Sequence, residues 1–199
     1  MLDIKTQAYL HVGTIKWGNF MQSMYEQRTG MMIGDRLHSV TYFTSNMHLD
    51  EQLESSRIAA HIVNKALIIQ MESGKCFRFI LGMEFDQYGL DVVIDNRHDA
   101  AYATQSHIDM SSTPCWERLI GQQIINIEYG WQQTGQINIP NLYTDYLRLT
   151  FQNNLAVIIC LPDYPEDVTF SWDVCEDIMV MFDEAQAMHH LAEFGRHKQ

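Results

Sequence analysis

The sequence predicts an α+β fold made of two internally duplicated antiparallel β-sheet units, about four strands each, with a few flanking helices. The first observation is a motif, I-G-x-x-[L/I]-x-x-[V/I]-x-Y, that occurs at residues 33–42 and again at 120–129. Two further apolar segments follow each copy in the same order, with offsets of 87, 80 and 88 residues between the matching pieces. A pattern that returns in register in this way is typical of an internal duplication.

The two later pieces are short and rich in the β-branched and aromatic residues that favour strands. Residues 67–71 match residues 147–151, and residues 90–95 match residues 178–183. The pattern leaves open whether the half-sheets join edge to edge or pack face to face, and whether a pseudo-twofold or a simple repeat relates them. It divides the chain into an N-terminal helical segment (1–30), a first β repeat (31–98), a connection (99–118) and a second, acidic β repeat with a C-terminal helix (119–199).

Apolar residues at helical spacing predict two helices in the first half. The first is a stripe that packs on the sheet, formed by Trp17, Phe20, Met21 and Met24. The second lies between residues 50 and 64, where the apolar face comprises Leu49, Leu53, Ala60 and Val63.

Glycines and prolines mark the turns. Gly34 and Gly121 each precede an extended pattern, which suits a positive φ angle at the end of a helical turn. Thr113 and Pro114 resemble a helix cap followed by proline at the first helical position. Each repeat therefore enters its sheet from a helical turn.

A β-hairpin is predicted in each repeat, around residues 73–75 and 152–154, because glycine or asparagine at the tip permits the positive φ of a tight turn. Residues 132–145 are rich in Gln, Asn and Gly and predict a loop. Asp183 is expected to cap a C-terminal helix that places Met188, Leu191 and Ala185 against the sheet.

The matched apolar positions predict the core of each repeat. In the first repeat these positions are Leu37, Val40, Leu67, Ile69, Val92 and Ile94, and in the second they are Ile124, Ile127, Leu147, Leu149, Val180 and Phe182.

Composition narrows the class of protein. The 199 residues contain no long apolar run, and the first ten residues lack the apolar region of a signal peptide, so we expect a soluble, cytoplasmic protein. The four cysteines are widely spaced and predict reduced, mostly buried thiols, not a zinc site or disulfides.

Charge is distributed unequally between the halves. The formal net charge is −12, and residues 119–195 hold eleven acids against a single base, Arg148. Such an acidic half argues against nucleic acid and against an anionic membrane as partners, and favours a basic one.

The sequence contains no phosphate-binding loop, dinucleotide fingerprint, nucleophile elbow or zinc-protease motif, so we expect no cofactor, no metal and no catalytic residue. The carboxylates near the end of the second repeat also lack the order of a calcium loop. They are interleaved with aromatic residues, and an acidic rim with aromatic anchors suits a protein-binding surface. The candidate partner-binding residues are Asp163, Tyr164, Glu166, Asp167, Trp172, Asp173, Glu176 and Asp177. The alternative interpretation is a solvated surface with inward-facing aromatic side chains.

Three hypotheses for function follow. The first is a non-enzymatic module that engages a basic protein through its acidic face. By analogy of composition, this class includes bacterial immunity proteins that neutralise a toxin such as a nuclease. The second is a small-molecule binder or enzyme with a site in the cleft between the repeats. The third is a subunit that forms a homodimer through an exposed strand edge.

Overall fold

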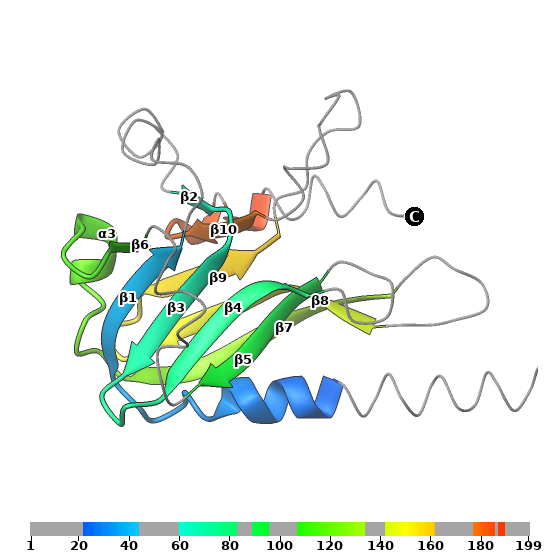
Figure 1. The fold of residues 1–199 in the computed structure, drawn as a ribbon, viewed down its shortest axis with the longest axis horizontal. Coiled ribbons are helices and arrows are strands. Elements are labelled where there is room, and N and C mark those ends of the chain that lie inside the picture. Colours follow the sequence, from blue (N-terminus) through cyan, green and yellow to red (C-terminus); the bar gives the residue numbers. More distant parts are fainter. Residues whose placement is uncertain are drawn as a thin grey trace, which may run out of the picture.

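The computed structural model describes residues 22–43, 60–82, 89–95, 107–133, 142–161, 177–185 and 187–189. Besides helical residues at 22–30 and after Asp183, these ranges contain strands and one short helix, shown in Figure 1. In chain order the elements are β1 (Leu37–Phe43), β2 (Ala60–Val63), β3 (Ala66–Met71), β4 (Cys76–Gly82), β5 (Gly89–Asp95), β6 (His107–Asp109), α3 (Pro114–Glu117), β7 (Ile124–Gln133), β8 (Leu142–Phe151), β9 (Ala156–Cys160) and β10 (Ile178–Met181).

The strands form two five-stranded antiparallel sheets. The order in the first sheet is β5-β4-β3-β1-β6, and the order in the second is β2-β10-β9-β8-β7. When β6 and β2 are set aside, the four remaining strands of each sheet have the same order, with β1, β3, β4 and β5 corresponding to β7, β8, β9 and β10. The predicted pair of duplicated antiparallel units, with about four strands each, is therefore confirmed.

The strand registers repeat as well as the strand order. Tyr42 lies opposite Leu67 in the first sheet, and Tyr129 lies opposite Leu147 in the second. Between the last two strands of each unit, Phe79 of β4 pairs with Val92 of β5, as Ile159 of β9 pairs with Val180 of β10. These pairs reproduce the offsets of 87, 80 and 88 found in the sequence.

Backbone irregularities also recur at matching positions. Gly34 and Gly121 have φ angles of +86° and +75°, and the hairpin residues Gly74 and Asn154 have φ angles of +85° and +62°. Both β1 and β7 carry a register shift two residues into the strand, after Leu37 and Ile124 respectively. The duplication thus preserved the positions where the backbone must depart from an ideal strand.

Reciprocal hydrogen bonds show that a pseudo-twofold, not a simple repeat, relates the units. The Gly34 N–H donates to the Ile124 carbonyl (2.8 Å), and the Gly121 N–H donates to the Leu37 carbonyl (2.7 Å). The two donors, Gly34 and Gly121, occupy equivalent positions in the repeats, and so do the two acceptors, Leu37 and Ile124. A twofold rotation therefore exchanges the two hydrogen bonds. Arg36 and Gln123, also equivalent, form a β-bridge with each other.

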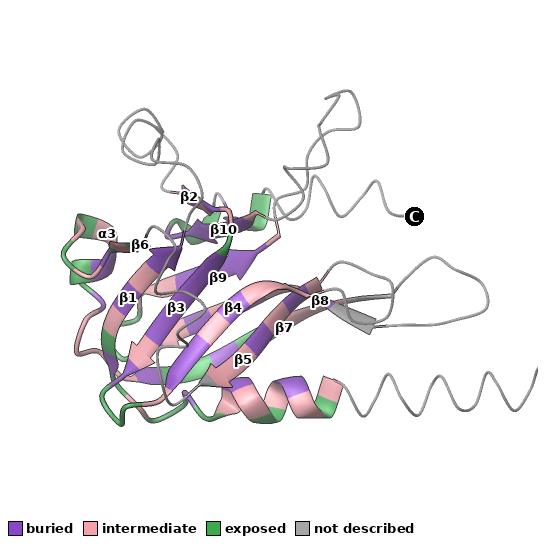
Figure 2. Cartoon of the chain, viewed as in Figure 1, coloured by how far each residue is buried: buried purple, intermediate pink, exposed green. Residues whose placement is uncertain are grey.

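The two sheets pack face to face around one core. A single apolar cluster takes side chains from the inner faces of both sheets, including Tyr42 and Phe77 from the first and Leu149 and Val180 from the second. Figure 2 shows buried residues alternating with less buried ones along the strands. Of the twelve predicted core residues, eleven are buried, and Ile94 is partly buried against the same cluster.

Three predicted segments differ from the structure. Ala60 and Val63 belong to strand β2 and not to a helix, because β2 pairs with β10 in the second sheet; residues 44–59 lie outside the described residues. The predicted loop at residues 132–145 is shorter, since β7 continues to Gln133 and β8 begins at Leu142. The predicted connection also contains β6, which pairs with β1.

The N-terminal helical residues 22–30 lie along one side of the sandwich in Figure 1, below β5 and β7. Tyr25 packs edge-on against Tyr129 and Trp131 of β7, while Arg28 lies 4.0 Å from the Asp91 carboxylate of β5. Trp17, Phe20 and Met21 of the predicted stripe lie outside the described residues. No helix in the described ranges is long and apolar enough to cross a membrane.

Candidate functional site

The predicted acidic surface is described at one residue only. Asp177 directly precedes β10 and is partly buried. The other seven members of the set fall between residues 162 and 176, outside the described residues, so their arrangement stays a prediction: Asp163, Tyr164, Glu166, Asp167, Trp172, Asp173 and Glu176.

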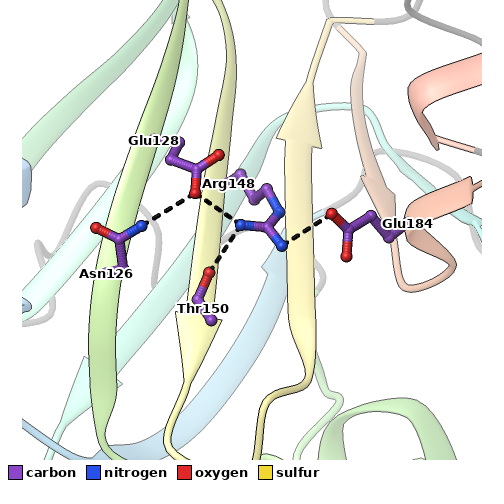
Figure 3. Close-up of polar contacts among 5 residues, drawn as sticks. All are labelled: Asn126, Glu128, Arg148, Thr150 and Glu184. Atoms are coloured by element: carbon purple, nitrogen blue, oxygen red, sulfur yellow. Dashed lines mark hydrogen bonds and ion pairs between the residues drawn. The ribbon is translucent and has the colours of Figure 1, made fainter.

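A polar cluster on the outer face of the second sheet is centred on Arg148 of β8 (Figure 3). The Arg148 Nη1 donates to the Glu128 carboxylate at 2.8 Å and to the Thr150 hydroxyl at 3.0 Å. The Nη2 atom forms an ion pair with Glu184 at 2.8 Å. Glu128 also accepts a hydrogen bond from the Asn126 amide at 3.0 Å.

The positions of these residues follow from the strand register. Glu128 lies directly opposite Arg148 on the neighbouring strand, where an ion pair of opposite charges stabilises the sheet. Glu184 comes from the first turn of the C-terminal helix, so Arg148 ties this helix to both strands. The Arg148 side chain is 17% exposed, whereas Glu128 and Glu184 are 53% and 55% exposed.

The cluster pairs the positive charge of Arg148 with carboxylates of the same chain. Arg148 is the only basic residue between positions 119 and 195, and both ends of its guanidinium group are occupied by carboxylates of the same chain. Its charge is therefore compensated within the fold. A partner that approaches the outer face of the second sheet meets the outward edges of two half-exposed carboxylates.

The C-terminal helix also covers a small apolar cluster on this outer face. Ala187 is fully buried there beside Ile158, Cys160 and Met181. The predicted orientation of this helix was wrong, since Met188 is 47% exposed and Ala185 is exposed. Leu191 lies outside the described residues.

A second polar cluster is buried between the sheets. The Trp116 indole donates a hydrogen bond to the Tyr42 hydroxyl at 2.8 Å, and the Tyr42 hydroxyl lies 2.8 Å from Nδ1 of His61. The rings of Trp116 and His61 both pack edge-on against Phe182, with centroids 5.0 Å apart in each pair. These side chains join β1, β2 and α3 through one hydroxyl group.

Burial strongly affects the two titratable groups of this cluster. Desolvation lowers the pKa of His61 from 6.5 to about 4, because the charged imidazolium is disfavoured away from water. Desolvation likewise raises the pKa of Tyr42 above its usual value, since it disfavours the phenolate. At neutral pH both side chains are uncharged, so the cluster can hold hydrogen bonds without a buried charge.

The other repeat carries a related contact. Tyr129, which matches Tyr42, has its hydroxyl 2.8 Å from the hydroxyl of Thr29, and Thr29 occupies the position that matches Trp116. Each repeat therefore places a residue of its leading helical turn against the tyrosine of the other repeat's first strand. The motif tyrosine that marks the duplication in the sequence serves to join the two units.

Among the described residues, no group of three or more His, Cys, Asp and Glu side chains is placed to hold a metal ion. Cys76 and Cys160 are buried thiols and Cys115 is partly buried, each without a disulfide. Burial raises the pKa of Cys160 to about 12, with the nearby Asp145 carboxylate acting in the same direction. A thiol with such a high pKa is a poor nucleophile at neutral pH.

Sequence reasoning missed both polar clusters. Arg148 stood out as the only Lys or Arg between residues 119 and 195, but its partners depend on the register between β7 and β8. His61 fell within a predicted helix, which concealed its role.

Comparisons with known protein families, with curated proteins and with solved structures find no match to this chain.

Proposed function

We propose that the protein is a non-enzymatic, cytoplasmic binding module whose second repeat engages a basic protein, in the manner of an immunity protein that neutralises a toxin. One observation carries the proposal. The two repeats share a strand order and a register, but they differ in charge. Residues 119–195 contain eleven acids and one base, which is most of the net charge of −12. The scaffold does not require this difference, because the first repeat builds the same strands without it.

The Arg148 cluster supports the same proposal. The one Lys or Arg between residues 119 and 195, Arg148, is paired with Glu128 and Glu184, so it offers little attraction to an acidic partner. Glu128 and Glu184 remain half-exposed and can accept further hydrogen bonds from a partner's arginine or lysine. Asp177 extends the acidic character to the start of β10.

The packing between the sheets gives less support to a small-molecule site between the repeats. In the described residues, that space is filled by fully buried side chains of both repeats, among them Trp116, Phe151 and Leu67. A ligand there would have to displace the core. The outer surface of the acidic repeat is the better candidate for binding.

The test compares two charge-reversed proteins of equal net charge. Asp173→Lys with Glu176→Lys alters the acidic repeat, and Glu72→Lys with Glu117→Lys alters exposed acids elsewhere; each pair moves the formal net charge from −12 to −8. A partner is first captured on the wild-type protein at low salt, and its association rate is then measured with all three purified proteins.

We expect the first variant to associate about tenfold more slowly than wild type at low salt, and the second to stay near the wild-type rate, because steering depends on charge close to the contact. Melting temperatures of all three should be similar. Equal rates for the two variants would mean that the acidic repeat is only a solvated surface, and would overturn the proposal.

A further inference from the structure

Strand β2 is held in place by a hydrogen bond that crosses the sandwich. β2 lies between β1 and β3 in the sequence of the first repeat, but it pairs at the edge of the second sheet, where His61 is opposite Val180 of β10. Its imidazole turns inward, is 8% exposed, and meets the Tyr42 hydroxyl of the first sheet at 2.8 Å. The strand has four paired residues and no described neighbour on its other side.

The donors and acceptors of this cluster determine the protonation of His61. An indole N–H can only donate, so the Tyr42 oxygen must accept from Trp116. The hydroxyl proton of Tyr42 has an acceptor in this cluster when it is directed to Nδ1 of His61 and that nitrogen is unprotonated. The tautomer that satisfies the hydroxyl group is therefore neutral His61 with its proton on Nε2.

A second proton on His61 disrupts this arrangement. It would place an N–H at Nδ1 facing the Tyr42 oxygen, so the Tyr42 hydroxyl proton would lose its acceptor among the rings of Trp116 and Phe182. The titratable groups that face His61 are Tyr42 from β1 and Cys115 from α3, and neither is a carboxylate. Val180 of β10 and Phe182, which follows this strand, are both apolar, so no described carboxylate offsets the new charge.

We propose that β2 is an acid-releasable edge strand: protonation of His61 breaks its bond to Tyr42, frees β2 from β10, and opens the β10 edge beside Asp177. The backbone groups of Ile178–Met181 then become available to pair with a different strand. This inference does not depend on the identity of any partner and stands independently of the proposed function.

The direction and size of the effect follow from linkage. Docking of β2 lowers the His61 pKa from 6.5 to about 4, so the docked strand is favoured above pH 6.5 and loses stability as the pH falls towards 4. If the released histidine has its ordinary pKa, the opening constant rises about twentyfold between pH 7 and pH 5.

Hydrogen exchange of backbone amides in the full-length protein tests this proposal. Protection factors, corrected for intrinsic exchange, are measured at pH 7 and pH 5 for β2 and β10, with β3 and β8 as internal references. We expect protection of β2 to fall about twentyfold in acid while β3 and β8 change little. Loss of protection in all four strands together would indicate global unfolding and would overturn local release.

Two variants separate His61 from the other histidines. His61→Asn removes the titration and keeps an acceptor towards Tyr42, so protection of β2 should become the same at both pH values. His38→Asn, at an exposed position of β1, should keep the wild-type pH response. If His61→Asn does not fold, the His61 ring protons of the wild type can be titrated by NMR; a midpoint near 6.5 would contradict the proposal, and one near 4 to 5 would support it.

Discussion

Ile69 and Leu149 occupy the same place in the two repeats, 80 residues apart, and both are fully buried. Each lies on an inner strand of its half-sheet, β3 or β8, and belongs to the shared core. Both residues could be assigned to the core from the sequence, because they are apolar and because alternation along a strand turns one face to the interior. Ile125, by contrast, is 46% exposed although it lies next to the buried Ile124.

Truncation of matched core residues should therefore have matched effects. Ile69→Ala and Leu149→Ala should each reduce the free energy of unfolding by about 2–5 kcal/mol, the usual range for a buried aliphatic side chain. Ile125→Ala is the control and should cost less than about 1 kcal/mol. Urea-induced unfolding followed by tryptophan fluorescence gives all three values; a loss at Ile125 as large as that at Leu149 would show that the assigned face of the sheet is wrong.

Strand β8 and the C-terminal helix are connected through Arg148, which contacts Glu128 on one side and Glu184 on the other. The guanidinium group is mostly buried, and its Nε atom has no hydrogen-bond partner among the described residues. Such a half-buried ion pair is worth more than an exposed one, since it is screened less by water and salt.

Removal of this arginine should loosen the helix before it unfolds the sheet. Arg148→Met should cost about 1–2 kcal/mol of unfolding free energy, between the values for exposed and buried pairs, and should reduce hydrogen-exchange protection of the Ala187 amide. Arg118→Met, which alters an exposed arginine outside the cluster, is the control. Unchanged protection at Ala187 in the Arg148 variant would mean that the apolar contacts alone hold the helix.

The hairpins and core positions could be predicted because their signals are local or repeated. Gly74 and Asn154 are hairpin residues that the turn requires, and the matching apolar positions confirmed each other across the repeats. Strand β2 could not be predicted, because its partner β10 is distant in the sequence and the spacing of Ala60 and Val63 also fits a helix. For the same reason the Arg148 and His61 clusters had no sequence signal, since each is assembled from segments that only the fold brings together.

The pseudo-twofold makes the two repeats mutually dependent. The first repeat supplies β2 to the second sheet and Tyr42 to Trp116, and the second supplies Tyr129 to Thr29. One apolar cluster spans both sheets, so neither repeat has a core of its own. A fold joined in this way is expected to unfold in a single cooperative transition.

Separation of the repeats provides the test. A fragment of residues 101–199 lacks β2 and would expose the inner face of its sheet, so we expect it to show no dispersed NMR spectrum and no cooperative thermal transition. Mixed with a fragment of residues 1–100, it should regain both, because each half then recovers the core face and the hydrogen bonds that the other provides. A fragment of residues 101–199 that folds cooperatively alone would show that the interlocking contacts are dispensable, and that the second repeat is an independent domain with the first repeat attached to it.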